Sequence, residues 1–141
     1  MIFITQQDLN TVIYQDILNI ISDSNSVDTA ELTAIEQAKG YLRNRFDCDL
    51  IFDSGSSYNS SGRNPLLVMY ICDLMIWHLY AAVAPNKISE SRINRRDIAV
   101  EWLKDVARGI SNPAFPIKQV GSPAEELQNS RFGHTCKNSG Y

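Results

Sequence analysis

The sequence lacks the paired cysteines that are typical of secreted domains and the phosphate-binding loop that is typical of many enzymes. Its 141 residues include only three cysteines, without a C-x-x-C pair, and seven scattered glycines that form no phosphate-binding loop. An odd number of unpaired cysteines argues against a disulfide framework and is typical of reduced thiols in the cytosol. The N-terminal Met1–Ile4 lacks a basic n-region and is too short for a signal peptide. A formal net charge of -3 is far from the strongly basic balance of a dedicated nucleic-acid binder.

Residue types that carry catalysis or hold metals do not come together in the sequence. There is no H-E-x-x-H motif. His134 and Cys136 lie two positions apart and supply only two of the four ligands of a structural zinc site. Cys72 and His78 lie about 240° apart around a helix, so they cannot act together as nucleophile and base. The sequence predicts no catalytic residue, no metal ligand, no cofactor and no enzymatic activity.

A nearly all-apolar run, Leu66–Ala84, follows Asn64 and Pro65 and predicts the central helix of the fold. Asparagine is a favourable N-cap, and proline suits the first helical position. At about 1.5 Å per residue the helix is long enough to cross a bilayer. However, the run contains Asp73 and His78, and an ionised aspartate costs about 2.5–3.5 kcal/mol at the centre of a membrane. We therefore expect a core helix with protein on every side.

Asp73 is the one carboxylate in this apolar run, and two interpretations of it are open. Carboxylates in apolar surroundings have shifted pKa values and can act as acids or bases. The alternative is a structural buried charge, in which an ion pair joins the central helix to another helix. The candidate partners are Arg43, Arg45 and Arg96.

Helical periodicity covers most of residues 1–110. Thr5, with Asp8 three residues later, forms an approximate capping box for a short first helix. A longer helix is expected to start at Asp28 or Thr29. The sequence thus predicts an all-α fold, a small bundle of about four to five helices around a central buried helix.

The last predicted helix runs from Ser89 to Gly109 and carries the only basic cluster, Arg92, Arg95 and Arg96. These side chains either contact phosphate or an acidic partner, or belong to a solvated helix face. The acidic residues that dilute the cluster are Glu90, Asp97 and Glu101.

Two segments lack helical periodicity, the loop Asp53–Gly62 and residues 111–141. The Ser/Gly/Asn composition of the loop predicts a segment that is flexible alone or ordered by a partner. Residues 111–141 are polar with scattered apolar side chains, which suits an extended C-terminal arm that orders on another protein; a disordered tail is the alternative. The arm residues predicted to contact a partner are Phe115, Ile117, Val120, Leu127, Arg131, Phe132 and Tyr141.

Several short motifs follow one another along most of the chain. They are Thr5-x-x-Asp8-Leu9, a helix through Ala38, Tyr41-Leu42 and Arg45-Phe46, then Arg63-Asn64-Pro65, Asp73 with His78-Leu79 and Tyr80, Trp102–Gly109, and Arg131-Phe132 with Lys137 and Gly140-Tyr141. In this order they resemble the head–tail connector (adaptor or head-completion) proteins of tailed bacteriophages, especially the Mu-like branch. The chain departs from the family at Cys48-Asp49, where Pro-Leu is frequent.

The resemblance implies a helical bundle of which about twelve copies form a ring on the portal protein of the capsid. Such a ring extends the DNA channel without binding DNA specifically and offers a surface to the next tail-side protein. The arm then reaches the portal or a neighbouring copy. The expected location is the head–tail neck of the virion, after synthesis in the host bacterial cytoplasm and without a membrane. Two other functions remain open, a small helical DNA-binding protein (regulator or packaging subunit) that uses the basic cluster, and an enzyme centred on Asp73.

Overall fold

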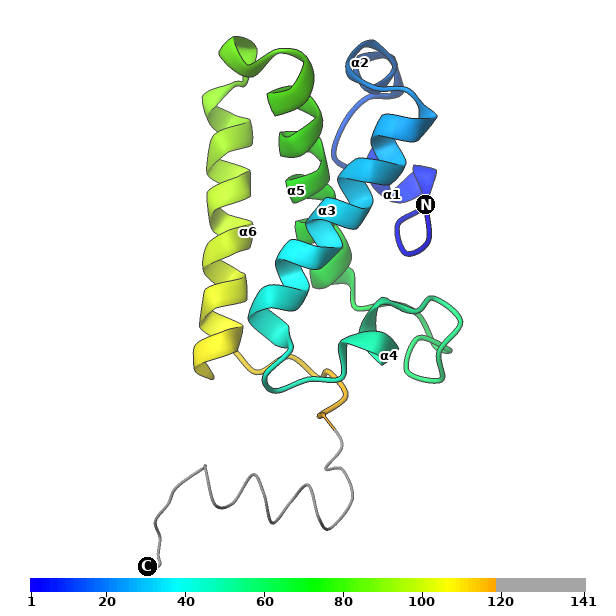
Figure 1. Ribbon diagram of the computed structural model, residues 1–141, viewed down its shortest axis with the longest axis vertical. Helices are drawn as coiled ribbons and strands as arrows, with labels where there is room; N and C mark the ends of the chain where they lie inside the picture. Colours follow the sequence, from blue (N-terminus) through cyan, green and yellow to red (C-terminus); the bar gives the residue numbers. More distant parts are fainter. Residues whose placement is uncertain (119–141) are drawn as a thin grey trace, which may run out of the picture.

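The computed structural model describes residues 1–118 and folds them mostly into helices (Figure 1). In chain order these are α1 (Gln6–Asn10), α2 (Gln15–Ile21), α3 (Ser24–Leu42), α4 (Cys48–Phe52), α5 (Pro65–Val83), the short 3-10 helix η1 (Pro85–Lys87) and α6 (Glu90–Arg108). Within the described residues there is no strand, only an isolated bridge between Phe46 and Ile117. The predicted all-α bundle is confirmed, with six α-helices in residues 1–118 where about four to five were expected.

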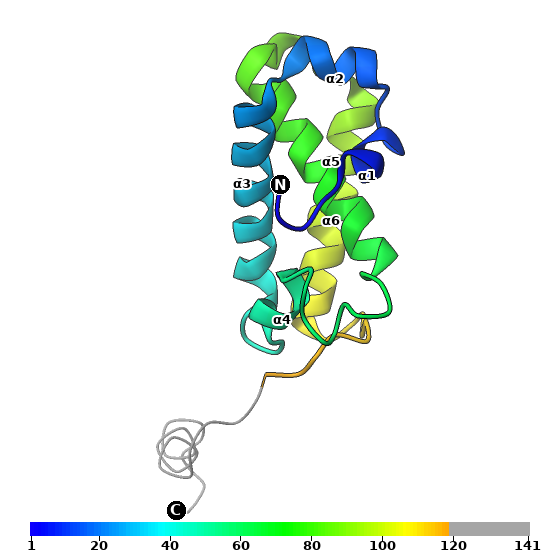
Figure 2. The same ribbon diagram turned by 90° about the vertical axis from the view of Figure 1, so that its right-hand side faces the viewer.

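Helix α5 is the central element, as predicted. It packs against α3, α6, α1 and α2, and Figure 2 shows α3 and α1 on opposite sides of it. The start of α5 follows from the local sequence. The Asn64 Oδ1 accepts hydrogen bonds from the backbone N–H groups of Leu66 (3.0 Å) and Leu67 (3.1 Å), and Pro65 occupies the first turn.

The expectation that protein surrounds α5 on every side is correct for its middle, where Ile71–Ile76 are all buried, and wrong toward its two ends. Leu66, Met69 and Val83 are exposed. The reason is the length of the covering helices, since α1 has 5 residues and α2 has 7 against 19 in α5. By length and composition α5 is apolar enough to cross a membrane, with a mean hydropathy of 1.8, but here its central residues are buried against neighbouring helices. The uncovered residues form part of the outer surface of the bundle.

Helix α3 starts at Ser24, earlier than the predicted Asp28 or Thr29. The Asp23 Oδ1 accepts a hydrogen bond from the Ser26 N–H (2.8 Å), and the Ser26 Oγ accepts one from the Asp23 N–H (2.8 Å). This reciprocal capping gives hydrogen-bond acceptors to backbone N–H groups that have no partner within the helix. It outweighs the low helix propensity of the serine-rich start. The buried face of α3 includes Ala30, Ala34 and Ala38, and α3 packs against α5.

Helix α6 begins and ends as the sequence predicts. The Ser89 Oγ accepts a hydrogen bond from the Arg92 N–H (3.2 Å), and Gly109 adopts a left-handed conformation with φ of 82° at the C-terminal cap. The helix packs along α5 and α3, and its buried residues are Ala99, Leu103 and Val106. α3, α5 and α6 together form the three long rods of the bundle (Figure 1).

Candidate functional site

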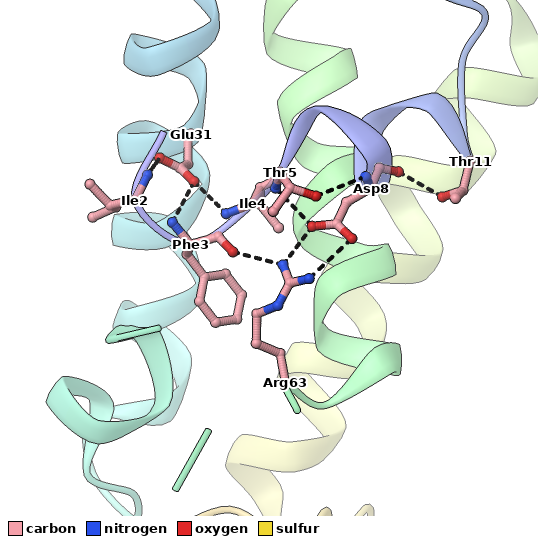
Figure 3. Close-up of polar contacts among 8 residues, drawn as sticks. All are labelled: Ile2, Phe3, Ile4, Thr5, Asp8, Thr11, Glu31 and Arg63. Carbon is pink, nitrogen blue, oxygen red and sulfur yellow. Dashed lines mark hydrogen bonds and ion pairs between the residues drawn. The ribbon is translucent and has the colours of Figure 1, made fainter. Parts of the chain in front are cut away.

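A cluster of charged side chains ties the N-terminal segment to the bundle (Figure 3). Glu31 of α3 is only 1% exposed and accepts hydrogen bonds from the backbone N–H groups of Ile2 (2.8 Å), Phe3 (2.9 Å) and Ile4 (2.7 Å). A buried carboxylate is costly unless hydrogen bonds satisfy it, and here three backbone donors do so. The same bonds hold the side chains of Phe3 and Ile4 in the core.

Arg63 joins this segment to α1 and to the start of α5. Its Nη1 donates to the Phe3 carbonyl oxygen (2.8 Å) and to Asp8, and its Nη2 donates to the Asp8 Oδ1 (3.2 Å). The Asp8 Oδ2 also accepts from the Thr5 N–H (2.7 Å), which confirms the predicted capping box. Burial of Asp8 acts to raise its pKa, but the hydrogen bonds from Arg63 and Thr5 outweigh burial, so the pKa lies below its ordinary value.

The pairing of Asp8 with Arg63 is expected to make the stability of the bundle depend on pH. We expect Asp8→Asn to lower the free energy of unfolding by about 2 kcal/mol near neutral pH, because charge-assisted hydrogen bonds become neutral ones. Since the pKa of Asp8 is lower in the folded state, its contribution is present above 3.8 and is lost as the pH falls through the folded-state pKa. Urea denaturation of both proteins at several pH values measures this difference. A difference that does not shrink in acid would contradict the assignment.

Glu31 was not among the residues predicted from the sequence, although a signal for it was present. Glu31 lies on the face of α3 that also carries Val27, Ala30, Ala34 and Ile35, at the spacing of a buried stripe. A single glutamate on such a stripe indicates a buried carboxylate that needs hydrogen-bond donors around it. The sequence does not show that the donors come from the N-terminal backbone, because they are not side chains.

Asp73 is a buried charge on α5, as one of the two interpretations predicted. Its partner is Arg95 of α6, whose Nε donates to the Asp73 Oδ1 at 2.7 Å. The predicted partners Arg43, Arg45 and Arg96 are therefore wrong, because these three side chains make other contacts. Burial raises the pKa of Asp73, and the Arg95 hydrogen bond and charge offset only part of this effect. The geometry fits an ion pair that fastens α6 to α5.

The arginine side chains of the basic cluster on α6 contact other groups of the same chain. The Arg92 Nη2 donates to the Val12 carbonyl oxygen (2.9 Å), and Arg95 pairs with Asp73. The Arg96 Nε donates to the Asp97 Oδ1 (2.7 Å), and its guanidinium lies 4.6 Å from the centre of the Trp77 ring. Two of the three charges are thus paired with carboxylates, so the structure does not present the cluster as three free cations for phosphate.

The loop Asp53–Gly62 is ordered by contacts within the chain, contrary to the prediction of a segment that is flexible alone or ordered by a partner. Asn59 is buried, and its Nδ2 donates to the carbonyl oxygens of Leu50 (3.3 Å), Ile51 (3.0 Å) and Asp53 (2.6 Å). The amide therefore satisfies carbonyl groups that the short helix α4 leaves free at its end. Composition alone predicted flexibility because it does not reveal hydrogen bonds between the Asn59 side chain and particular backbone groups.

Phe115 belongs to the core and not to a free arm, so its predicted role as a partner contact is wrong. It is 6% exposed and packs edge-on against Phe46, with ring centres 5.4 Å apart. The ring centres of Trp102 and Tyr58 lie 6.2 Å and 6.4 Å from the ring centre of Phe115. Edge-on aromatic contacts of this kind are favourable. The three rings that contact Phe115 belong to three different parts of the chain.

The segment around Phe115, residues 110–118, is here called the arm root. The Asp47 N–H donates to the Pro116 carbonyl oxygen (2.9 Å), and the Lys118 N–H donates to the Arg45 carbonyl oxygen (3.0 Å). The Arg45 Nη1 in turn donates to the Val106 carbonyl oxygen (2.7 Å). The packed domain therefore continues to Lys118, and the boundary predicted after residue 110 lies too early.

Of the remaining predicted arm contacts, Ile117 is 71% exposed and is available to a partner. The other predicted contacts, Val120, Leu127, Arg131, Phe132 and Tyr141, lie outside the described residues.

The described residues offer little reactive chemistry. Burial raises the pKa of the Cys72 thiol to about 12, so it stays protonated and unreactive near neutral pH. The His78 Nε2 lies 3.1 Å from the Gln37 Oε1, and burial lowers the pKa of this histidine. Within residues 1–118 no group of three or more His, Cys, Asp or Glu side chains is placed to hold a metal ion.

Comparison with family models, with curated proteins and with solved structures gave no match. The resemblance to head–tail connector proteins therefore stays a prediction.

Proposed function

We propose that this chain is a structural virion protein that forms a ring at the phage head–tail interface, docks on the portal protein and extends the DNA channel. The observation that carries the proposal is the arm root. It is fastened to the segment that joins α3 to α4, through Arg45 and Asp47, and to α6, through the contact of Phe115 with Trp102, at the end of the bundle that holds α4 (Figure 1). Residues 119–141, which are polar in composition, follow directly on this packed segment in the sequence.

The electrostatics of the bundle support the same proposal. The chain has a formal net charge of -3, and Arg95 and Arg96 are engaged by Asp73 and Asp97. Phosphate contacts made by several free cations would hold DNA in a salt-dependent grip. A bundle without such a cluster suits a channel through which DNA passes, and it disfavours the alternative of a small DNA-binding protein.

Purified full-length protein mixed with portal rings tests the proposal. Electron microscopy is expected to show an added ring of density on one end of the portal. Portal rings that stay unchanged at high protein concentration would contradict the proposal. A gel-shift titration over a range of salt concentrations provides the second measurement, since steep salt-dependent affinity for DNA would favour the DNA-binding alternative.

A further inference from the structure

The last described residues run antiparallel to the segment that joins α3 to α4. Phe46 and Ile117 form an antiparallel bridge, and the Lys118 N–H donates to the Arg45 carbonyl oxygen (3.0 Å). Antiparallel segments advance in opposite directions, so the chain at Lys118 heads back toward Arg43, the C-terminal cap of α3. Arg43 and Lys118 also line one hollow of about 340 Å³. The chain beyond Lys118 therefore begins beside the end of α3.

A stripe of side chains continues from this point along α3. Leu32, Glu36, Lys39 and Arg43 recur every three or four residues, so they lie on one face of the helix. Leu32 is 54% exposed, and the side chains of Glu36 and Arg43 are 65% and 61% exposed. Glu36 and Arg43 form an ion pair of 3.8 Å, a surface contact that contributes little to stability. Residues 1–118 thus leave this face of α3 largely uncovered.

The stripe borders a second and larger hollow, of about 590 Å³, between α3, α4 and the N-terminal segment. Its apolar floor includes Leu32 and the buried ring of Phe52. Cys48 and Asp49 line both hollows, so the two adjoin at the start of α4. We call the two hollows together the α3 groove. The α3 groove leads from Lys118 to the apolar floor.

The charges of the α3 groove and of the last part of the chain are complementary. Three acids and one base line the larger hollow, namely Glu36, Asp49, Asp53 and Lys39. In the sequence Arg131 and Lys137 lie on either side of Phe132, and residues 127–141 contain no acid. A basic segment with an aromatic side chain suits an apolar hollow with an acidic rim.

The chain between Lys118 and Phe132 is long enough for this basic segment to reach the α3 groove of its own molecule. From Arg43 to Leu32 the helix is about 16 Å long, at about 1.5 Å per residue. Residues 119–131 span up to about 40 Å when extended. A tether of this length keeps the segment at a high local concentration, so a contact of low intrinsic affinity is enough to hold it.

We infer that residues 127–137 of the free chain bind in the α3 groove of the same molecule. Phe132 packs on the floor formed by Leu32 and Phe52, and Arg131 lies against the acidic rim. The contact covers an aromatic side chain that the arm otherwise offers to a partner, so the arm shields itself until a partner displaces it. The inference goes beyond the proposed function and does not depend on it, because the contact forms within one chain.

Paramagnetic relaxation in the full-length protein tests the inference. A nitroxide is attached to Cys136, and mass spectrometry checks that each chain carries one label. Cys48 and Cys72 are buried, and burial raises the pKa of both thiols, which disfavours their labelling. The amide signals of Leu32 and Asp49 are expected to be broadened beyond those of α2, which Figure 1 and Figure 2 place at the opposite end of the bundle from α4. Equal broadening at both ends would overturn the inference.

Two aromatic variants identify the side chain that enters the α3 groove. Phe132→Ser is expected to lower the equilibrium constant for docking by about 30-fold, the effect of losing a central anchor. Tyr141→Ser is the matched control, because it removes an aromatic ring of the arm outside residues 127–137. This control is expected to leave the broadening unchanged, and equal effects of the two replacements would contradict the role of Phe132.

A charge exchange tests the acidic rim. Arg131→Glu and Glu36→Arg are each expected to reduce the broadening at the α3 groove, because each brings like charges together. The double variant restores a pair of opposite charges and is expected to recover much of the broadening. Thermal melting checks that the variants are folded, as expected for replacement of the exposed Glu36. A double variant as impaired as the single ones would refute the placement of Arg131.

Mixing two preparations separates a contact within one chain from a contact between copies. Protein with the isotope label but no nitroxide is mixed with protein that carries the nitroxide but no isotope label, and no broadening at the α3 groove is expected. Broadening in this mixture would place the arm of a second copy in the groove and overturn the inference. Portal binding is measured separately. A chain that ignores portal rings and still shows the contact within one chain would lose only the proposed role at the portal.

Discussion

Replacing Glu31 with alanine is expected to lower the free energy of unfolding by about 4 kcal/mol. The carboxylate accepts three backbone hydrogen bonds, and those from Phe3 and Ile4 are buried. Removal leaves these donors without a partner and away from water, and each such donor costs about 1–3 kcal/mol. The variant is also expected to release the N-terminal segment from the core, since Glu31 supplies the acceptors for three consecutive residues.

Chemical denaturation measures the change in stability, and amide hydrogen exchange at Phe3 and Ile4 measures the release. Glu31→Gln keeps the size of the side chain but turns one acceptor into a donor, so an intermediate loss of about 2 kcal/mol is expected. Glu36→Ala is the matched control on the same helix. Glu36 is exposed and makes only a 3.8 Å surface ion pair with Arg43, which contributes at most about 1 kcal/mol. Equal losses for Glu31→Ala and Glu36→Ala would refute the anchoring role of Glu31.

Two truncations are expected to separate folding from assembly. Deleting residues 119–141 leaves the arm root and Phe115 in place, so the bundle is expected to keep its stability and to lose assembly onto portal rings. Deleting residues 112–141 also removes Phe115 from its contacts with Phe46 and Trp102. The shorter protein is therefore expected to lose a further 3–5 kcal/mol or so of stability, as for the loss of a buried phenylalanine.

Thermal melting and electron microscopy of the protein with portal rings measure the two effects. Phe115→Ala in the full-length chain serves as the control, because it removes the core contact and keeps residues 119–141. This variant is expected to be destabilised and still to assemble at a temperature where it is folded. A protein lacking residues 119–141 that completes infectious heads would contradict the role proposed for the arm.

Features governed by neighbouring residues were predictable from the sequence. The start of α5 at Asn64 and Pro65, the capping box of Thr5 and Asp8, and the end of α6 at Gly109 all depend on residues within one helical turn. One helix start was nevertheless predicted wrongly, because a capping signal competed there with low helix propensity. The start of α3 was placed too late because the serine-rich residues after Asp23 resemble a turn until their reciprocal hydrogen bonds are known.

Features that join distant residues were not predictable in the same way. The partner of Asp73 proved to be Arg95, whereas the sequence favoured arginines that include its neighbour Arg96. Adjacent helix positions differ by about 100° in direction, so the choice between them depends on how α6 lies against α5. The burial of Phe115 likewise depends on rings from three distant segments.

The sequence by itself determined the helical class, the central position of α5, the starts of α1 and α5 and both ends of α6, because periodicity and capping act over a few residues. Only the tertiary structure decided that Glu31 anchors the N-terminal backbone, that the Asp53–Gly62 loop is ordered by Asn59, and that the domain extends to Lys118. Each of these depends on hydrogen bonds between groups that are not neighbours in a helical turn, from six to nine residues apart for Asn59 to more than 25 for Glu31. Backbone groups are the partners in all three cases, and backbone groups are the same at every position of a sequence.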